Sequence, residues 1–169
     1  MMPTDNSYGD RQRRNAPQQP VPDVAGRLVP RATDFEASVL GALMLEKDAF
    51  SQVCDLLKPE SFYEPRHAVI YNAIQMLGLK QEPIDLMTVT QSLRRTGDLE
   101  KVGGAAYIAN LSGNVVSAAH IEFHARIVAQ KYLARQLIGF ATNIENGAFD
   151  ESNDIDDLLQ EAESRLFEI

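Results

Sequence analysis

The sequence predicts an all-α protein, with a small multi-helical globular bundle followed by a long helical hairpin at the C-terminus. Two observations support this fold class. Apolar residues recur at three- and four-residue spacing in segments that proline, glycine and asparagine separate, and this spacing gathers side chains on one face of a helix. No segment alternates apolar and polar residues cleanly enough to indicate a half-buried strand.

Residues 1–32 are expected to form a disordered tail. Five of the eight prolines lie before residue 31, among several Gln and Asn residues and almost no large apolar ones. Such a segment cannot bury enough apolar surface to offset the entropy lost on ordering. The arginines at positions 11, 13 and 14 are expected to be solvated.

The globular bundle is expected over residues 33–116. It begins with a capping box, in which the Thr33 oxygen accepts from a free backbone N–H and Glu36 reaches back to the cap. This first helix should run to about Glu46. Asp48 should cap a second helix that ends before Pro59. Cys54 lies on the apolar face of that helix, so core filling is the expected role of its side chain.

Three further helices complete the bundle. Pro65 lies in the first turn of the third helix, where proline is favoured, and Gly78 is expected to end it. Asp85 should cap a short helix that Gly97 closes. The Gly103–Gly104 pair is expected to be a turn into another short helix.

Residues 117–169 are expected to form a helical hairpin for assembly. One helix should run from Ser117 to Asn146 and would be roughly 45 Å long, so part of it must project from a domain of this size. After a break at Asn146–Gly147, a second amphipathic helix should reach the last residue. Two helices alone have too little core, so their remaining apolar surface should meet another copy or another protein.

Phe140 is expected at the edge of the apolar stripe of the first helix, where its ring can reach a neighbouring subunit. The residues predicted to mediate self-association or partner binding are Ile127, Ala134, Leu137, Ile138, Phe140, Ala141, Ile144, Ile155, Leu158, Leu159, Ala162 and Leu166.

Charge is concentrated at the C-terminal end. The formal net charge is −8, and residues 145–169 carry nine acids against one base, while the rest of the chain is neutral overall. This distribution gives no electrostatic footprint for binding nucleic acid and would suit a basic protein partner at the tip of the hairpin. No apolar run approaches the ~20 residues of a membrane span, and no signal peptide precedes the bundle. A cytoplasmic protein is therefore expected.

The sequence predicts no catalytic, cofactor-binding or metal-binding residue. None of the five lysines is followed by Ser or Thr, which excludes a phosphate-binding loop of the Gly-Lys-Ser/Thr type. His120 and His124 are spaced as a metal pair requires, but the sequence offers no obvious third ligand, so a surface or packing role is expected. His67 is isolated in the sequence.

Several ordered motifs together resemble one known family. They are Val39–Leu45, Phe62–Tyr63 followed by His67 and Ile70–Tyr71, Pro83–Leu86, Gly97–Leu99, Val102–Ile108 and Ala162–Ile169. With these motifs the chain resembles, over about residues 33–169, the N-terminal domain of the bacterial replicative DNA helicase of the DnaB type. The tail before Thr33 has no counterpart in that family. The family continues, beyond the point where this chain stops, into a linker and a RecA-like ATPase domain.

The resemblance implies a collar function. In the family, six N-terminal domains assemble as a trimer of dimers, hairpins pair across subunits, and the collar receives the C-terminal, helicase-binding domain of primase. A helicase loader is a further partner that the resemblance suggests. ATP, magnesium, single-stranded DNA and the helicase activity are expected for the full-length ring and not for this fragment.

Two alternatives remain open from the sequence. The chain could be a stand-alone helical adaptor that caps or competes with a helicase ring. It could also be a small metal-dependent enzyme that uses His120 and His124, which stoichiometric metal in the purified protein would support.

Overall fold

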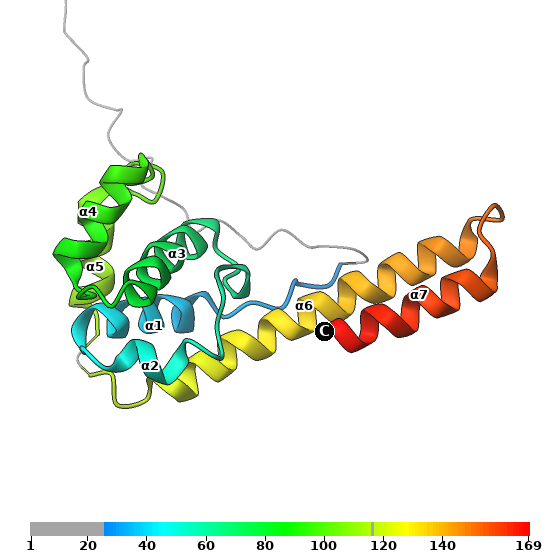
Figure 1. The fold of residues 1–169 in the computed structure, drawn as a ribbon, viewed down its shortest axis with the longest axis horizontal. Helices are drawn as coiled ribbons and strands as arrows, with labels where there is room; N and C mark the ends of the chain where they lie inside the picture. Colours follow the sequence, from blue (N-terminus) through cyan, green and yellow to red (C-terminus); the bar gives the residue numbers. More distant parts are fainter. Residues whose placement is uncertain (1–25, 116) are drawn as a thin grey trace, which may run out of the picture.

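The computed structural model describes residues 26–115 and 117–169. These residues form helices and no strand, so the predicted all-α fold is confirmed. Figure 1 shows a globular head, residues 26–132, from which a two-helix arm projects; we call this arm, residues 133–169, the projecting hairpin. Most of the predicted disordered tail, residues 1–25, lies outside the described residues.

The described part contains α1 (Thr33–Leu45), α2 (Ala49–Val53), the 3-10 helix η1 (Pro59–Ser61), α3 (Pro65–Leu79), α4 (Leu86–Thr96), α5 (Gly104–Gly113), α6 (Ile121–Phe149) and α7 (Ile155–Glu168). No helix of this part is long and apolar enough to cross a membrane.

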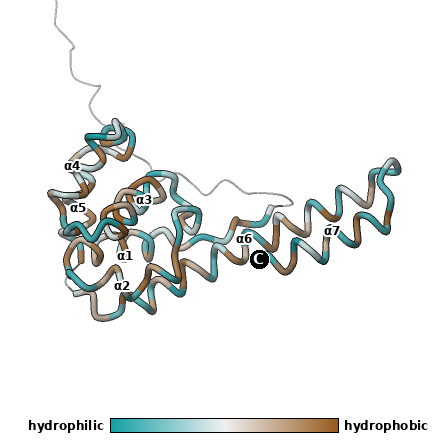
Figure 2. Tube along the Cα trace, viewed as in Figure 1, coloured by the Kyte–Doolittle hydropathy of each residue, from teal (hydrophilic) through white to brown (hydrophobic). Residues whose placement is uncertain are grey.

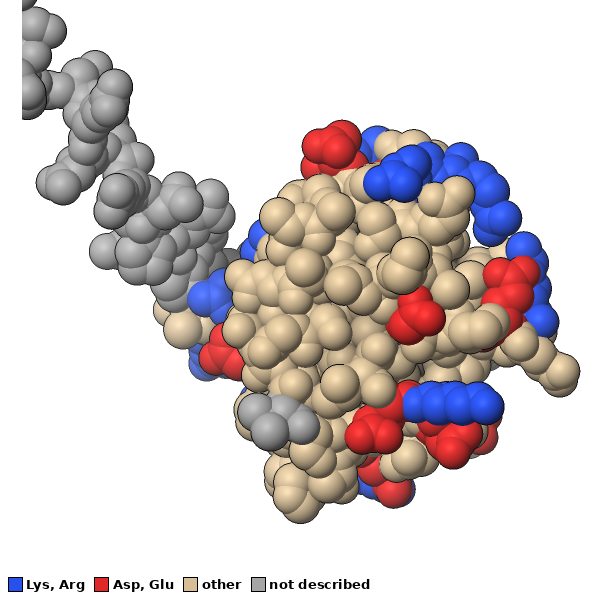
Figure 3. Space-filling model, turned by 90° about the vertical axis from the view of Figure 1, so that its left-hand side faces the viewer, with Lys and Arg blue, Asp and Glu red and all other residues tan. Residues whose placement is uncertain are grey.

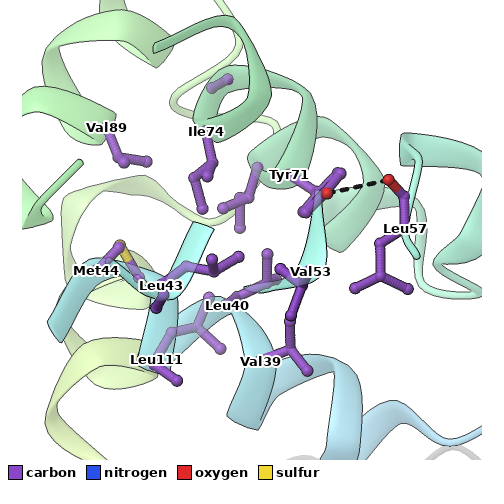
Figure 4. Packing of buried hydrophobic residues seen from close by; sticks show 14 of the residues in the cluster. Val39, Leu40, Leu43, Met44, Val53, Leu57, Tyr71, Ile74, Val89 and Leu111 are labelled. Atoms are coloured by element: carbon purple, nitrogen blue, oxygen red, sulfur yellow. Dashed lines mark hydrogen bonds between the residues drawn. The ribbon is translucent and has the colours of Figure 1, made fainter. Parts of the chain in front are cut away.

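Helix α1 lies at the centre of the head and is surrounded by α3, α5 and α6 (Figure 1). Its residues Val39, Leu40 and Leu43 are fully buried, and Figure 4 shows them packed against side chains from the neighbouring helices. Complete burial of one such side chain contributes about 1.5–3 kcal/mol. The hydroxyl of buried Tyr71, on α3, donates a hydrogen bond to the Leu57 carbonyl at 3.1 Å.

A close approach of α5 to α1 occurs at Gly41. A Cβ atom built on this glycine would overlap the carbonyl oxygen of Leu111 and lie 2.6 Å from Cγ2 of Val115. Because the first of these neighbours is backbone, it cannot rotate away. Only glycine at this position lets the two helices pack at this distance.

The caps of α4 are as predicted. The Asp85 carboxylate accepts hydrogen bonds from the backbone N–H groups of Met87 at 2.8 Å and Thr88 at 2.9 Å. Gly97 ends the helix in the left-handed conformation, with φ of 79°. Both features depend on residues within one turn of the helix end, so local sequence is enough to identify them.

The capping box predicted at the start of α1 is wrong. Ala32 is the N-cap and makes no side-chain hydrogen bond to the helix. The Glu36 carboxylate turns instead into the head, where it accepts hydrogen bonds from the backbone N–H groups of Tyr63 and Glu64. These two donors precede α3, whose first turn has free N–H groups and a favourable dipole for an acid.

The second helix is shorter than predicted. It ends at Val53, and turns lead from there to the short η1 helix. Pro59 holds only the residue before it, Lys58, in an extended conformation. Asp48 is its N-cap, as predicted, but makes no side-chain hydrogen bond to it. Cys54 lies just past the end of α2 and is only partly buried, so its expected role as core filler is wrong.

Gly78 does not end α3, which continues to Leu79. This glycine lies under the ring of Phe50, where a Cβ atom would overlap the ring carbons. Tight packing therefore explains the glycine, and a left-handed residue, Gln81 with φ of 58°, follows the helix end. The expected turn at Gly103–Gly104 is present, since both residues have positive φ.

The long helix α6 starts four residues later than predicted and ends at Phe149, beyond the expected break at Asn146–Gly147. Gly147 stays helical because it faces α7, where a Cβ atom would lie 2.8 Å from Cδ1 of Leu158. Packing between the two helices thus outweighs the cost of about 1 kcal/mol of a glycine inside a helix. After the turn between α6 and α7, Asp154 is the N-cap of α7, and its carboxylate accepts a hydrogen bond from the backbone N–H of Asp156 at 2.8 Å.

Candidate interface on the projecting hairpin

The projecting hairpin has little core of its own. Within α6 the buried residues all lie in the head, and α7 has none. Figure 2 shows hydrophobic residues recurring along both helices of this arm. Six large apolar side chains on it are between 42% and 61% exposed: Leu133, Leu137, Ile138, Ile155, Leu159 and Leu166.

One side of each helix forms the seam between α6 and α7. On α6, Phe140, Ile144 and Gly147 follow each other at four- and three-residue intervals and are half-buried. On α7, Leu158 and Ala162 are half-buried and one turn apart. The close approach of Gly147 and Leu158 fixes how these two sides meet.

The exposed apolar residues lie together on one side of this seam. Viewed from the start of α6, Leu137 and Ala141 are displaced clockwise from the seam residues of that helix. Viewed from the start of α7, Ile155 and Leu159 are likewise displaced clockwise from Leu158. Because the helices are antiparallel, clockwise displacements on the two helices lead to the same side of the hairpin. Ile138 lies further round α6, at the far edge of this side. We call this side the outer apolar face: Leu137, Ile138, Ala141, Ile155, Leu159 and Leu166.

The structure therefore divides the predicted interface residues into three groups. The outer apolar face holds six of them, and the seam holds Phe140, Ile144, Leu158 and Ala162. Ile127 and Ala134 are half-buried nearer the head. The contact of Phe140 with another subunit stays a prediction. Sequence reasoning missed Leu133, which is one turn before Leu137 and 42% exposed.

The joint between the hairpin and the head is built around Arg135, which sequence reasoning did not single out. Its guanidinium donates hydrogen bonds to the carbonyls of Pro30 at 3.0 Å and Ser61 at 2.7 Å. Burial lowers the pKa of Arg135, partly countered by the charge of Glu36, which raises it. Since arginine stays charged at neutral pH, α6 is bound to two other segments by charged hydrogen bonds.

Aromatic rings continue this joint on both sides of Arg135. Its guanidinium carbon lies 5.7 Å from the ring centre of Tyr63 and 5.6 Å from that of Tyr132. Arg31 lies 5.6 Å from the Tyr63 ring, and the Lys58 ammonium lies 5.1 Å from the Tyr132 ring. The five side chains thus form a ladder of alternating cations and rings that ties the N-terminal segment, η1 and α6 together.

Two of the three histidines, His67 and His124, make contacts in the head, whereas His120 is the exposed N-cap residue of α6 and makes no side-chain hydrogen bond to that helix. His67, which the sequence left isolated, is buried, with Nδ1 at 2.8 Å from the Glu36 carboxylate and Nε2 at 2.7 Å from the Tyr107 hydroxyl. His124 packs edge-on against the ring of Phe35, with 5.3 Å between ring centres. Across residues 26–115 and 117–169, no group of three or more His, Cys, Asp or Glu side chains could hold a metal ion.

Comparison with known proteins gives the chain its family. A model of the DnaB-like helicase N-terminal domain matches residues 29–130. The replicative DNA helicase DnaB of Rhodothermus marinus is 42% identical over 145 residues, which are 86% of this chain and 15% of that protein. The replicative DNA helicase DnaC of Bacillus subtilis (strain 168) is 41% identical over 143 residues, which are 85% of this chain and 32% of that protein.

Solved structures agree with these relatives. The crystal structure of the N-terminal domain of DnaB helicase from Mycobacterium tuberculosis has a TM-score of 0.78 and 35% identity, and covers 83% of this chain and 99% of that one. A DnaB-like replicative helicase, whose structure was described with its interactions with primase, has a TM-score of 0.66 and 28% identity, covering 82% of this chain and 31% of that one. The chain spans less than a third of the length of these curated relatives, and it belongs to the family of DnaB-like helicase N-terminal domains.

Proposed function

We propose that this chain is the collar domain of a hexameric replicative DNA helicase, and that it assembles through the outer apolar face of its hairpin. The observation that supports this most directly is the alignment of exposed apolar residues of α6 and α7 on one side of the arm. A second copy, turned by a two-fold axis, presents the same face, so two hairpins can pack as a four-helix bundle. Dimers formed in this way would be the units of a trimer of dimers.

We further propose that the paired hairpins form part of the docking surface for the C-terminal domain of primase. Interactions with primase are described for a relative of similar structure. The nine acids of residues 145–169 would favour a basic partner surface at the tip. A helicase loader is a further partner of the same collar.

The catalytic functions belong, in this proposal, to other parts of the whole helicase. The present sequence lacks a phosphate-binding loop of the Gly-Lys-Ser/Thr type, since none of its lysines is followed by Ser or Thr. ATP, magnesium and single-stranded DNA would bind elsewhere in the full-length ring, which would act in the bacterial cytoplasm at the replication fork. The role of this chain would be assembly and partner recruitment.

A charge on the outer apolar face tests the proposal. Leu137→Asp combined with Leu159→Asp should dissociate dimers or higher assemblies, because burying two unpaired carboxylates costs several kcal/mol. Both positions are exposed, at 43% and 59%, so the isolated chain should keep its helicity. Asn143→Asp, an exposed position of α6 on the other side of the seam, is the matched control and should leave assembly unchanged.

Sedimentation and circular dichroism on the same samples decide the outcome. Unchanged association of the double variant with intact helicity would refute assembly through this face. The affinity of the isolated primase C-terminal domain for the double variant and for the Asn143→Asp control then tests the proposed primase docking. Full affinity for the dissociated double variant would separate primase binding from hairpin pairing.

A further inference from the structure

The head carries an apolar groove at the end opposite the projecting hairpin, between α4, α5 and the end of α3. The volume of this groove is about 700 Å³. The apolar lining comes from Leu77, Leu86, Met87, Ala105 and Ala109. None of these residues belongs to the hairpin, so the groove is separate from the proposed assembly surface.

The α5 side of the groove lacks the charges that a solvated surface normally carries. Helix α5 has no charged residue, and its exposed positions include Ala105, Ala106 and Ala109. Figure 3, which faces this end of the head, shows a broad area without Lys, Arg, Asp or Glu. Depletion of charge and small side chains that allow close approach are typical of the centre of an interface.

Met87 protrudes beside this uncharged area, with 81% of its side chain exposed. A methionine is flexible and polarisable, and it adapts its shape to an apolar partner surface. Together with the apolar lining of the groove, this exposed side chain enlarges a contiguous apolar patch, and such patches mark interaction sites.

Two arginines lie at one end of the groove. Arg94 and Arg95 belong to the last turn of α4, line the groove and are exposed. Neither forms an ion pair within the described residues. The Arg94 guanidinium donates a hydrogen bond to the side-chain oxygen of Gln91, at 3.3 Å. Figure 3 shows basic side chains gathered along the upper rim of the uncharged area, on the side of α4. The single acid in the lining is Glu82.

We propose that this groove binds an amphipathic helix of a partner protein, which inserts apolar side chains between α4 and α5 and carries acidic residues opposite Arg94 and Arg95. A helix is favoured because the described residues contain no strand whose edge could pair with an extended peptide. Helix α4 has 11 residues and is about 16 Å long, so the groove matches roughly three turns of a partner helix. Acidic residues are favoured because Arg94 and Arg95 form no ion pair within residues 26–115 and 117–169, although the chain as a whole is acidic.

A library of helical peptides tests the chemistry of the occupant. Peptides about 16 residues long, with one face randomised, are displayed and selected on the full chain. Peptides that also bind the Ala109→Phe variant are removed, because a phenylalanine at this exposed position fills the groove. The enriched peptides should share apolar residues at i, i+4 and i+7 and acids on one flank. Enrichment of peptides with basic or uncharged flanks would overturn the proposal.

Fluorescence anisotropy then measures the affinity of the labelled, selected peptides for purified variants of the chain. Ala109→Phe, and Ala105→Leu as a milder change, should weaken binding at least about tenfold. The Arg94→Glu and Arg95→Glu double variant should do the same, with a loss that shrinks at high salt. Lys131→Glu, an exposed change of α6 outside the groove, is the matched control and should have no effect.

Three further results would overturn the proposal. No peptide is enriched over the Ala109→Phe variant, or the arginine variants bind like the original chain. Alternatively, Ala109→Phe lowers the sedimentation coefficient of the chain without any peptide, and the occupant is then a second copy. Thermal melts monitor the folding of each variant, and Ala105→Leu provides the test if Ala109→Phe unfolds.

Discussion

Nδ1 of His67 lies 2.8 Å from the Glu36 carboxylate, and both side chains are buried in the head, at 3% and 1% exposure. The same carboxylate accepts the backbone N–H groups of Tyr63 at 2.7 Å and Glu64 at 3.2 Å. One acid on α1 therefore organises the chain before α3, and His67 extends the connection to Tyr107 on α5. No polar atom of this set is left without a partner.

Replacing Glu36 with leucine should destabilise the protein by about 3–5 kcal/mol, because two half-buried backbone N–H groups lose their acceptor and the buried His67 ring loses its partner. Glu36→Gln should cost less, since one acceptor oxygen remains. Chemical denaturation measures both changes. Asp34→Asn, an exposed change two residues earlier on the same helix, is the control and should lie within about 0.5 kcal/mol of the original chain. Equal stability of Glu36→Leu and the control would show that the buried network does not stabilise the fold.

Gly41→Ala should destabilise the head by about 1–3 kcal/mol, since the added methyl group meets the Leu111 carbonyl and Val115. Gly113→Ala is the matched control, because it lies in α5 with no atom within 4 Å of its added Cβ. That change should be neutral or should stabilise the protein by up to about 1 kcal/mol. Thermal melts of the two variants should move in opposite directions or differ clearly in size, and equal shifts would contradict the close helix approach.

Arg135→Met should loosen the joint between the head and the hairpin, because the carbonyls of Pro30 and Ser61 lose their charged donor. A loss of about 1.5–3 kcal/mol is expected. Spin labels at exposed Gln91 and Asn146, in a Cys54→Ser background, should give a broader distance distribution in this variant. Arg126→Met is the control, since Arg126 is exposed and its ion pair is with Glu122 on the same helix. An unchanged distribution in Arg135→Met would show that other contacts fix the joint.

The Phe140→Asp variant distinguishes packing of Phe140 against α7 in the seam from a contact of Phe140 with another subunit. The structure places Phe140 one turn before Ile144, on the half-buried side of α6 that meets α7. A carboxylate there should open the hairpin and reduce its helicity at neutral pH. Circular dichroism with intact helicity, together with lost association, would instead support the subunit contact predicted from the sequence.

Alkaline pH should destabilise the head through Tyr71. Burial raises the pKa of this phenol above its ordinary value of 10.0, and the nearby Cys54 raises it further. The neutral phenol is therefore favoured in the folded state, and this stabilisation is complete below pH 10 and is lost as pH rises above it. Tyr71→Phe removes the titrating group, so its free energy of unfolding should fall less steeply above pH 10. Parallel curves for the two proteins would refute this assignment.

Local signals in the sequence predicted the fold class and the caps of α4, because helical spacing and the Asp85 and Gly97 caps act within a few residues. The role of Glu36 was not predictable in this way, since its partners lie 27–31 residues further along the chain. The break expected at Gly147 was wrong for a similar reason, because packing on Leu158 keeps that glycine helical. Of the predicted interface, periodicity found the apolar residues, but only the three-dimensional pairing of α6 with α7 separates the seam from the outer apolar face.

The continuity of α6 makes the hairpin a lever on the head. One unbroken helix of 29 residues joins the buried side chains of Ala125 and Val128 to the tip at Phe149. The tip lies about 31 Å beyond Val128 along the helix axis, so a tilt of roughly 5° at the head moves it by about 3 Å. In the opposite direction, a small force at the tip exerts a large torque on the contacts of α6 with α1 and α2. A protein bound at the tip of the hairpin would therefore transmit force along α6 to the centre of the head without contacting the head.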